Sequence, residues 1–214
     1  MSDDVQRYEG KTLTVLFDGA RCIHARQCVL GLPEVFRANV EGPWIDPDGA
    51  EPDEVRALAR RCPSGAIRVE PKDGVSAERP PKKNAVAVVE NGPLAVRADL
   101  RIVGQEPRIR ATLCRCGASA KKPFCDGSHE TMGFAATGEP PAANELATLD
   151  ETGPLTVKLA KNGPLLLEGP AEVVRGGTGK PIRRAMKMAL CRCGGSKNKP
   201  FCDGTHASIG FEAE

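Results

Sequence analysis

The first pattern along the chain is an alternation of apolar and polar residues over 11–18. A period of two places the apolar side chains on one face of an extended segment, so it predicts a β-strand. Residues 67–70 form a short run of similar character, and we expect them to pair with the first strand. The stretch that these two strands enclose is expected to form one small domain over residues 10–70.

A different period governs the segment 52–62 between those strands. Its apolar side chains recur at i, i+3, i+4 and i+7, which predicts a helix with one buried stripe that ends at Cys62. Pro52 suits the first turn of such a helix, because an N–H at that position would have no partner within the helix. Pro63 helps to end the helix.

The chain after residue 84 carries short apolar runs bounded by Gly-Pro turns, which predict strands. The segment NGPLAV at 91–96 recurs as NGPLLL at 162–167, so this part of the chain contains two copies of one β-rich unit. We expect the copies to span 85–134 and 147–214. The segment 71–84 before them has the composition of a linker. The predicted strands are 85–89, 94–102, 155–160 and 165–174.

Composition narrows the fold class. Aromatic residues make up only 4% of the 214 residues, whereas there are 23 glycines and 18 prolines. Small domains that are poor in large apolar side chains often depend on a metal or on disulfides for their stability. The sequence therefore predicts an α+β protein built from small metal-stapled domains, with an N-terminal α+β unit followed by two β-rich units.

Charge and aromatic content exclude some classes of partner. The net charge of +2 gives no reason to expect nucleic acid, and the single Trp44 and single Tyr8 offer no platform for stacked bases. The polar start MSDDVQRYEG lacks the features of a secretory signal, and no run of about 18 apolar residues is long enough to span a membrane. We expect a soluble cytoplasmic protein without a nucleic-acid partner.

The cysteines point to metal chemistry. There are nine of them, an odd number in a chain that shows no export signal, which argues against a disulfide framework. They form three sets of three, and each of the three histidines falls within one set. No Cys or His is left over, so we infer three inorganic centres. The candidate ligands are Cys22, His24, Cys28 and Cys62; Cys114, Cys116, Cys125 and His129; and Cys191, Cys193, Cys202 and His206.

The second and third sets share one spacing. The string CRCGASAKKPFCDGSH at 114–129 recurs as CRCGGSKNKPFCDGTH at 191–206. Three cysteines and one histidine can hold a structural zinc ion, or a [2Fe–2S] cluster with two ligands on each iron. Both metals remain open on spacing alone. Asp126 and Asp203 are placed to cap the turn that carries each histidine.

The literal string Cys-Asp-Gly-Ser-His at 125–129 is the one that names the CDGSH iron–sulfur (mitoNEET-like) family. Both copies resemble the longer family pattern C-x-C-x2-[ST]-x3-P-x-C-D-G-[STA]-H. The resemblance implies that each copy holds one [2Fe–2S] cluster through its three cysteines and its histidine. It also implies that the two copies pair about a pseudo-twofold axis within one chain. The other pattern positions are Ser119, Pro123 and Asp126 in the first copy and Ser196, Pro200 and Asp203 in the second.

Residues 11–70 resemble the divergent single-cluster ferredoxin domain of bacteria. Cys22 and Cys28 stand where the outer cysteines of a C-x2-C-x2-C motif would be, and Cys62 precedes a proline as the remote ligand does. Ala25 replaces the middle cysteine. The resemblance implies a [4Fe–4S] or [3Fe–4S] cluster on a ferredoxin-like fold, with His24 either as a further ligand or as a loop residue nearby. The alternative is a reduced site without a cluster.

A histidine among thiolates changes the chemistry of an iron centre. Neutral imidazole carries less negative charge than thiolate, so it should raise the reduction potential. It can also be protonated, and as the pH falls a proton competes with iron for the ring nitrogen. We expect the clusters bound through His129 and His206 to be lost at mildly acidic pH.

These observations predict a protein without catalytic activity of its own, because no catalytic or nucleotide-binding motif stands out beside the metal ligands. We expect one-electron transfer or redox sensing with a redox protein as partner. The alternatives are donation of clusters to an apo-protein acceptor, with a role in iron homeostasis, an electron-feeding subunit of a larger oxidoreductase, or a zinc-stapled interaction module. Because the motif is duplicated within the chain, we expect a monomer.

Basic residues accompany the paired motifs. We interpret them as a solvated rim, and the alternative is that they steer an acidic redox partner. They are Arg115, Lys121, Lys122, Arg192, Lys197 and Lys199.

Overall fold

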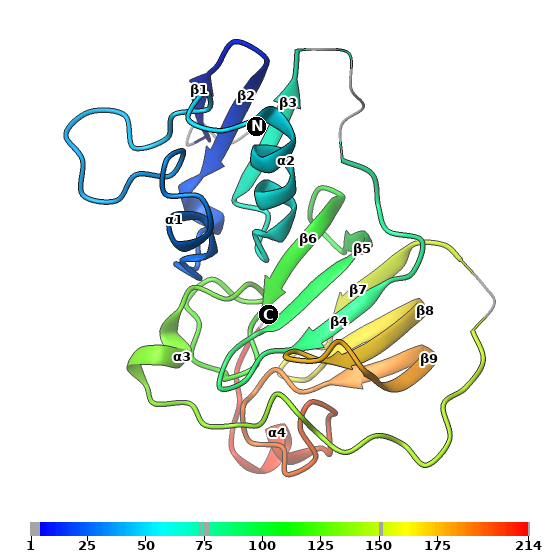
Figure 1. Cartoon of the computed structure of the whole chain (residues 1–214). Coiled ribbons are helices and arrows are strands. Elements are labelled where there is room, and N and C mark those ends of the chain that lie inside the picture. Colours follow the sequence, from blue (N-terminus) through cyan, green and yellow to red (C-terminus); the bar gives the residue numbers. More distant parts are fainter. Residues whose placement is uncertain (1–4, 73, 75–77, 150–151, 214) are drawn as a thin grey trace. The chain divides into compact units, whose positions relative to one another are not determined.

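The computed structural model describes residues 5–72, 74, 78–149 and 152–213. The chain forms two compact units, residues 1–79 and residues 80–214, and the protein is α+β with few, short helices (Figure 1). Part of the predicted linker, residues 73 and 75–77, lies outside the described residues. No helix among the described residues is long and apolar enough to cross a membrane.

The first unit is built on an antiparallel sheet in the order β1-β2-β3. The predicted strand at 11–18 is β2 (Leu13–Asp18), and it pairs with β3 (Ile67–Pro71) as expected from the run at 67–70. The edge strand β1 (Val5–Glu9) was not predicted, because its sequence is polar and its side chains are largely exposed. The edge strand of this sheet therefore could not be predicted from an apolar pattern.

The helix predicted over residues 52–62 is α2 (Pro52–Arg61), which ends one residue earlier than predicted. Glu51 and Glu54 form a capping box at its start, where their side chains bond each other's backbone N–H groups. Cys62 follows the last turn with φ −61° and ψ 112°. It is extended because a residue before proline is driven out of the helical region, so the helix ends before Cys62.

A small core holds these elements together. Phe36, Ile45, Val55 and their neighbours are buried between the sheet and α2, and Trp44 meets Phe17 edge to face at 4.9 Å between ring centroids. Two short helical segments, the 3-10 turn η1 (Gly19–Arg21) and the helix α1 (Gln27–Gly31), complete the unit. The core residues are Leu13, Val15, Val35, Phe36, Ile45, Val55, Leu58, Ala59 and Ile67, with Cys28 and Cys62 packed against them.

The second unit contains both copies of the repeat in one six-stranded sheet. Each copy supplies three strands in the same order, and the second strand is the longest of the three in both copies. The first copy contributes β4 (Ala85–Val88), β5 (Leu94–Ile102) and β6 (Arg108–Leu113); the second contributes β7 (Leu155–Leu159), β8 (Leu165–Arg175) and β9 (Pro181–Leu190).

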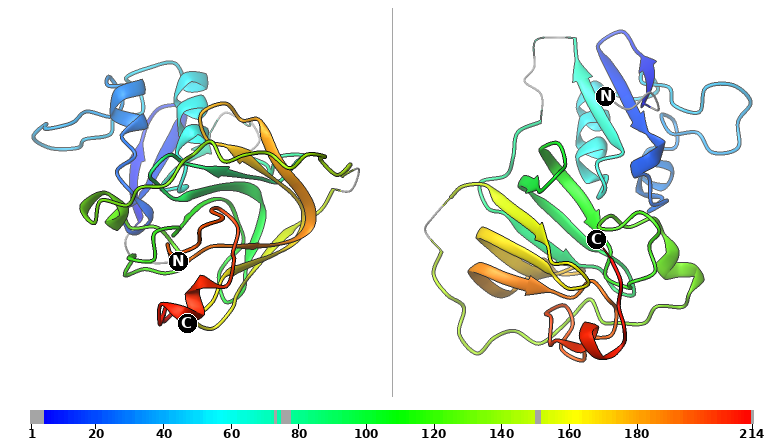
Figure 2. Two further views of the ribbon diagram at one scale, coloured as in Figure 1. Left: turned by 90° about the horizontal axis from the view of Figure 1, so that it is seen from below. Right: turned by 180° about the vertical axis from the view of Figure 1, so that it is seen from behind.

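The first strand of each copy pairs with both copies. β4 pairs antiparallel with residues 94–97 of its own β5 and parallel with residues 172–175 of β8. β7 pairs antiparallel with residues 165–168 of its own β8 and parallel with residues 100–102 of β5. β6 and β9 lie outside β5 and β8 (Figure 2). Neither copy therefore completes its sheet without the other.

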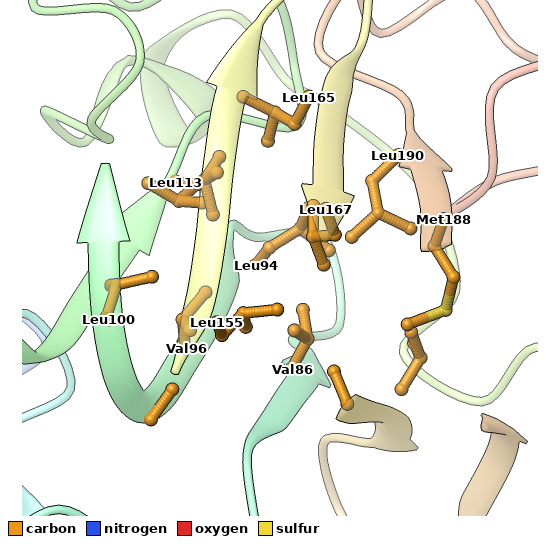
Figure 3. Close-up of a cluster of buried hydrophobic side chains, with 14 of the residues drawn as sticks. Val86, Leu94, Val96, Leu100, Leu113, Leu155, Leu165, Leu167, Met188 and Leu190 are labelled. Carbon is orange, nitrogen blue, oxygen red and sulfur yellow. The ribbon is translucent and has the colours of Figure 1, made fainter. Parts of the chain in front are cut away.

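All six strands contribute to one apolar core, as the close-up in Figure 3 shows. Burial alternates along β5, where every second side chain from Leu94 to Ile102 is buried, as the period of two predicts. β6 was not predicted, because arginines interrupt its apolar pattern. The labelled core residues are Val86, Leu94, Val96, Leu100, Leu113, Leu155, Leu165, Leu167, Met188 and Leu190.

Candidate metal centres

Each paired motif begins where an outer strand ends and then doubles back along it. In the first copy, the N–H of Cys114 donates to the carbonyl of Pro123 (2.8 Å), and the N–H of Cys125 donates to that of Thr112 (2.9 Å). This short ladder sets Leu113 opposite Phe124, and it holds the segment that carries the third cysteine against the end of the strand that precedes the first. The second copy repeats it from Cys191 to Pro200 (2.8 Å) and from Cys202 to Ala189 (2.9 Å).

The predicted ligands meet in pairs. The sulfurs of Cys114 and Cys116 lie 3.7 Å apart, and the sulfur of Cys125 lies 3.3 Å from Nδ1 of His129. Two thiolates on one tetrahedral ion would be about 3.8 Å apart, and a thiolate and an imidazole about 3.6 Å, given bond lengths near 2.3 and 2.1 Å. In the second copy Cys191 and Cys193 are 3.6 Å apart, and Cys202 and His206 are 3.4 Å apart.

A short helix presents each histidine. α3 (Ser128–Thr131) begins after Gly127, whose φ of +92° turns the chain. The carboxylate of Asp126 accepts hydrogen bonds from the N–H groups of Ser128 (3.0 Å) and Ala120 (2.8 Å), so it holds the turn as predicted, although the N-cap residue of the helix is Gly127. Burial raises the pKa of Asp126, but these bonds outweigh it and lower the pKa to about 2. In the second copy α4 (Thr205–Ser208), Gly204 and Asp203 have the same arrangement.

The N-terminal ligands line one cavity of about 390 Å³. Cys22, Cys28 and Cys62 all line it. The pKa of Cys22 is raised, mainly by burial and in part by the charge of Cys62. His24 also lines the cavity, on an exposed loop where its φ is +53°. Arg37 lines it too, and its buried Nε has no hydrogen-bond partner among the residues that the structure describes. That donor would suit the sulfides of a bound cluster.

The family comparisons agree with this geometry. The family model described as iron-binding zinc finger, CDGSH type, matches residues 91–130 and 162–207, which contain the two paired motifs. The chain is a CDGSH iron–sulfur protein. Its N-terminal residues 8–72 match the family described as divergent 4Fe-4S mono-cluster.

The chain is also similar to two curated proteins. The chain is 36% identical over 61 residues to the uncharacterized protein YjdI of Escherichia coli K12, a match that covers 28% of this chain and 79% of that relative. The YjdI of Escherichia coli O157:H7 matches to the same extent. No solved structure matches the chain.

The thiols of the first CDGSH motif compete for protons. A hydrogen bond from Cys114 lowers the pKa of Cys116 to about 6, and the same contact together with burial raises the pKa of Cys114. Burial raises the pKa of Cys125 to about 11. Three buried thiolates so close together repel one another, so the site favours a bound cation that neutralises them. The donor set therefore fits iron.

The two CDGSH motifs touch through their backbones. A Cβ added to Gly117 would lie 2.5 Å from the carbonyl oxygen of Cys193, and one added to Gly194 would lie 2.3 Å from that of Cys116. Both glycines have positive φ, +86° and +78°. The contact is reciprocal, so each C-x-C-G loop is fitted against the other and needs glycine there.

The repeated NGPL turn has a role that the sequence did not reveal. Asn91 and Ala136 exchange two hydrogen bonds, of 2.9 Å from the Asn91 N–H and 3.0 Å to its side-chain oxygen. Asn162 does the same with Ala213, at 2.8 and 2.9 Å. Each turn thus fastens the chain that follows a histidine-bearing helix. The recurrence of the turn in both copies was the available signal.

The interpretation of the basic residues as a solvated rim was wrong for two of them. Arg115 and Arg192 are buried, with 1% and 0% exposure, because each donates hydrogen bonds to backbone carbonyls beneath its motif. Lys122 donates to the carbonyl of Ser119 at 2.6 Å, and Lys199 makes the same contact with Ser196. The arginine that stands between two ligand cysteines in both copies was the signal for this.

Proposed function

We propose that this protein carries a [2Fe–2S] cluster in each CDGSH motif and a third iron–sulfur cluster in its N-terminal domain, and that it passes single electrons between protein partners. The observation that carries the proposal is the pairing of ligands in both motifs, Cys with Cys and Cys with His, at distances suited to one tetrahedral ion per pair. A [2Fe–2S] cluster takes two ligands on each iron, so the two pairs of one motif would supply its two irons.

The pairing favours a two-iron centre over the zinc alternative. A structural zinc ion draws all four ligands around one point. Two ligands per iron need no such convergence. The match to a family described as iron-binding supports the same choice, so a zinc-stapled module is the less favoured function.

The chain's own residues would fix how such a cluster works. Cys114, Cys116 and Cys125 are buried, with 0%, 7% and 7% exposure, so they exclude water from the thiolate side. The side chain of His129 keeps 11% exposure and turns Nε2 towards Glu130, 3.9 Å away. The histidine edge is thus where a partner could approach most closely. A bound [2Fe–2S] cluster supplies one-electron redox chemistry.

The pairing of strands between the copies supports a pseudo-twofold relation between them. Each first strand pairs with the second strand of the other copy, and each CDGSH loop contacts the other loop at equivalent glycines. A closed arrangement of this kind within one chain satisfies both copies, so we propose a monomer. The partners would be redox proteins or apo-protein acceptors rather than a second copy.

For the N-terminal domain we propose a ferredoxin-like site with a [4Fe–4S] or [3Fe–4S] cluster. Three cysteines around one cavity support the trio as ligands, and the family match supports a 4Fe-4S type. His24, on the same cavity, is the proposed further ligand where four irons are present. His24→Ala should then convert a [4Fe–4S] signal in electron paramagnetic resonance into a [3Fe–4S] signal; an unchanged spectrum would leave His24 a loop residue.

Electron transfer and cluster donation predict different behaviour in one experiment. We expect anaerobically purified protein to be reduced and reoxidised repeatedly, with its visible spectrum recovered each time. The holo-protein is then mixed with an apo-ferredoxin and the two are separated. Iron and sulfide that stay on this chain support the electron carrier. Their appearance on the acceptor supports the donor role and overturns the carrier.

A further inference from the structure

A buried serine lies beside one of the N-terminal cysteines. Ser64 is 4% exposed, and its side-chain oxygen lies 3.7 Å from the sulfur of Cys62. Both residues line the cavity that Cys22 and Cys28 also line. A hydroxyl shielded from water needs hydrogen-bond partners, because burying an unpaired polar group is costly. The sulfur of Cys62 can serve as one of these partners.

A tight turn connects the cysteine and the serine. The carbonyl of Cys62 accepts a hydrogen bond from the N–H of Gly65 (3.3 Å), which closes a β-turn. Pro63 occupies the second position of this turn, where its fixed φ is favourable. The turn is also tied to the sheet, because the N–H of Asp18 at the end of β2 donates to the carbonyl of Ala66 (2.8 Å). The backbone therefore fixes the place of the hydroxyl relative to the sulfur.

The direction of the contact follows from another hydrogen bond of the serine. The N–H of Ala66 donates to the side-chain oxygen of Ser64 at 3.3 Å. This bond uses a lone pair of the oxygen and leaves the single hydroxyl proton free to be donated. A cysteine that binds a metal is a thiolate and has no proton of its own to donate. With a cluster bound, the hydroxyl is therefore the donor and the sulfur of Cys62 is the acceptor.

We propose that Ser64 donates a hydrogen bond to the ligand sulfur of Cys62 and thereby raises the reduction potential of the N-terminal cluster. This inference rests on the proposed function. Hydrogen bonds to charged acceptors are roughly twice as strong as those between neutral groups. One-electron reduction adds negative charge to a cluster, and hydrogen bonds to the sulfurs are among the factors that set its potential. The hydroxyl should therefore stabilise the reduced cluster more than the oxidised one.

The test is a redox titration of the full-length holo-protein, followed by electron paramagnetic resonance. The signal that is lost from Cys62→Ser is assigned to the N-terminal cluster. Ser64→Ala removes the hydroxyl, and Ser64→Thr keeps it. Thr14→Val is the matched control in the same unit, because Thr14 is 1% exposed and its hydroxyl donates to Glu9 (3.2 Å). The alternation along β2 places Thr14 on the opposite face from Phe17, which lines the cavity.

We expect Ser64→Ala to lower the midpoint potential of the N-terminal cluster, and Ser64→Thr and Thr14→Val to leave it near the wild-type value, even where thermal unfolding shows that they are less stable. An unchanged or higher potential in Ser64→Ala would overturn the inference. Equal shifts in Ser64→Ala and either of the other variants would also overturn it, because they indicate a structural role alone. Loss of the N-terminal signal from Ser64→Ala would do the same, since the serine would then retain the cluster instead of tuning its potential.

The wild-type titration separates this inference from the proposed function. A one-electron signal that depends on Cys62 must be present before any variant of Ser64 is compared. If wild-type protein shows no such signal, the proposed N-terminal cluster fails, and the inference about Ser64 fails with it. If the signal is present and Ser64→Ala does not lower its midpoint potential, only the inference about Ser64 fails.

Discussion

The two histidines proposed as ligands would set the chemistry of the paired sites. Each uses Nδ1 beside a cysteine sulfur, at 3.3 Å in the first motif and 3.4 Å in the second. Imidazole can be displaced by a proton, whereas thiolate ligands need stronger acid, so the histidine is the weak point of each site at low pH. This makes the ligand swap at these positions informative.

We expect wild-type protein to lose its visible absorbance as the pH falls to about 5, the lower end of the range in which histidine titrates. His129→Cys should keep part of that absorbance, and its cluster should have a lower midpoint potential because a thiolate adds negative charge. His206→Cys is the matched variant for the other site. Wild-type absorbance that persists unchanged at pH 5 would contradict the assignment of histidine as a ligand.

Ser119 shows how one buried hydroxyl shapes a motif. It is 1% exposed, donates to the carbonyl of Phe124 (2.6 Å) and accepts from the N–H of Lys121 (3.1 Å). Ser119→Ala should cost about 1–3 kcal/mol, because buried groups lose their partners. Each kcal/mol corresponds to a fall in Tm of about 2–4 °C in a chain of this size. The exposed Ser208→Ala is the control, and equal Tm values for both variants would refute this role.

At the residue scale, the candidate ligands could be selected from the sequence, whereas the residues that support them could not. The spacing of Cys and His selected side chains that the structure brings together as Cys–Cys and Cys–His pairs in both motifs. Arg115 looked like any basic surface residue. Its burial depends on carbonyls of the turn at 89–92 and of the segment 136–137, which are distant in sequence. No local pattern encodes such contacts.

At the scale of elements, the strands were easier to predict than their partners. β5 was predicted with its observed bounds, since its alternation is regular and turns flank it. The pairing of β4 and β7 with both copies could not be predicted from the sequence. A period of two shows which face of a strand is buried, but it does not show which strand lies next to it. β6 was missed for its arginines, one of which, Arg108, lies over the ring of Phe124 at 4.5 Å.

The loop contact between the copies gives a prediction at this scale. Gly117→Ala should destabilise the second unit by the cost of a positive φ, about 1–2 kcal/mol, plus about 1–3 kcal/mol for the clash with the carbonyl of Cys193. Gly104→Ala carries only the first cost, because it has a φ of +78° and open space around it. Thermal unfolding compares the two. Equal Tm values for the two variants would mean that the close contact between the two C-x-C-G loops does not affect stability.

At the scale of the whole molecule, two units with separate cores carry separate ligand sets. Removing one ligand of the N-terminal trio should therefore affect that centre alone. We expect Cys62→Ser to lower the iron content by about the three or four atoms of one such cluster, while the signals of the CDGSH motifs remain. Cys202→Ser should instead remove the cluster of the second CDGSH motif, while the signal of the N-terminal cluster remains. Loss of all the iron from either variant would contradict independent sites.

The most direct test of the central claim is the content of iron, zinc and acid-labile sulfide per chain, measured on protein purified without oxygen. Two [2Fe–2S] clusters and one three- or four-iron cluster predict about seven or eight irons, with about as much sulfide and little zinc. About one zinc per motif without sulfide would contradict the account, and would make the paired motifs structural metal sites instead of redox centres.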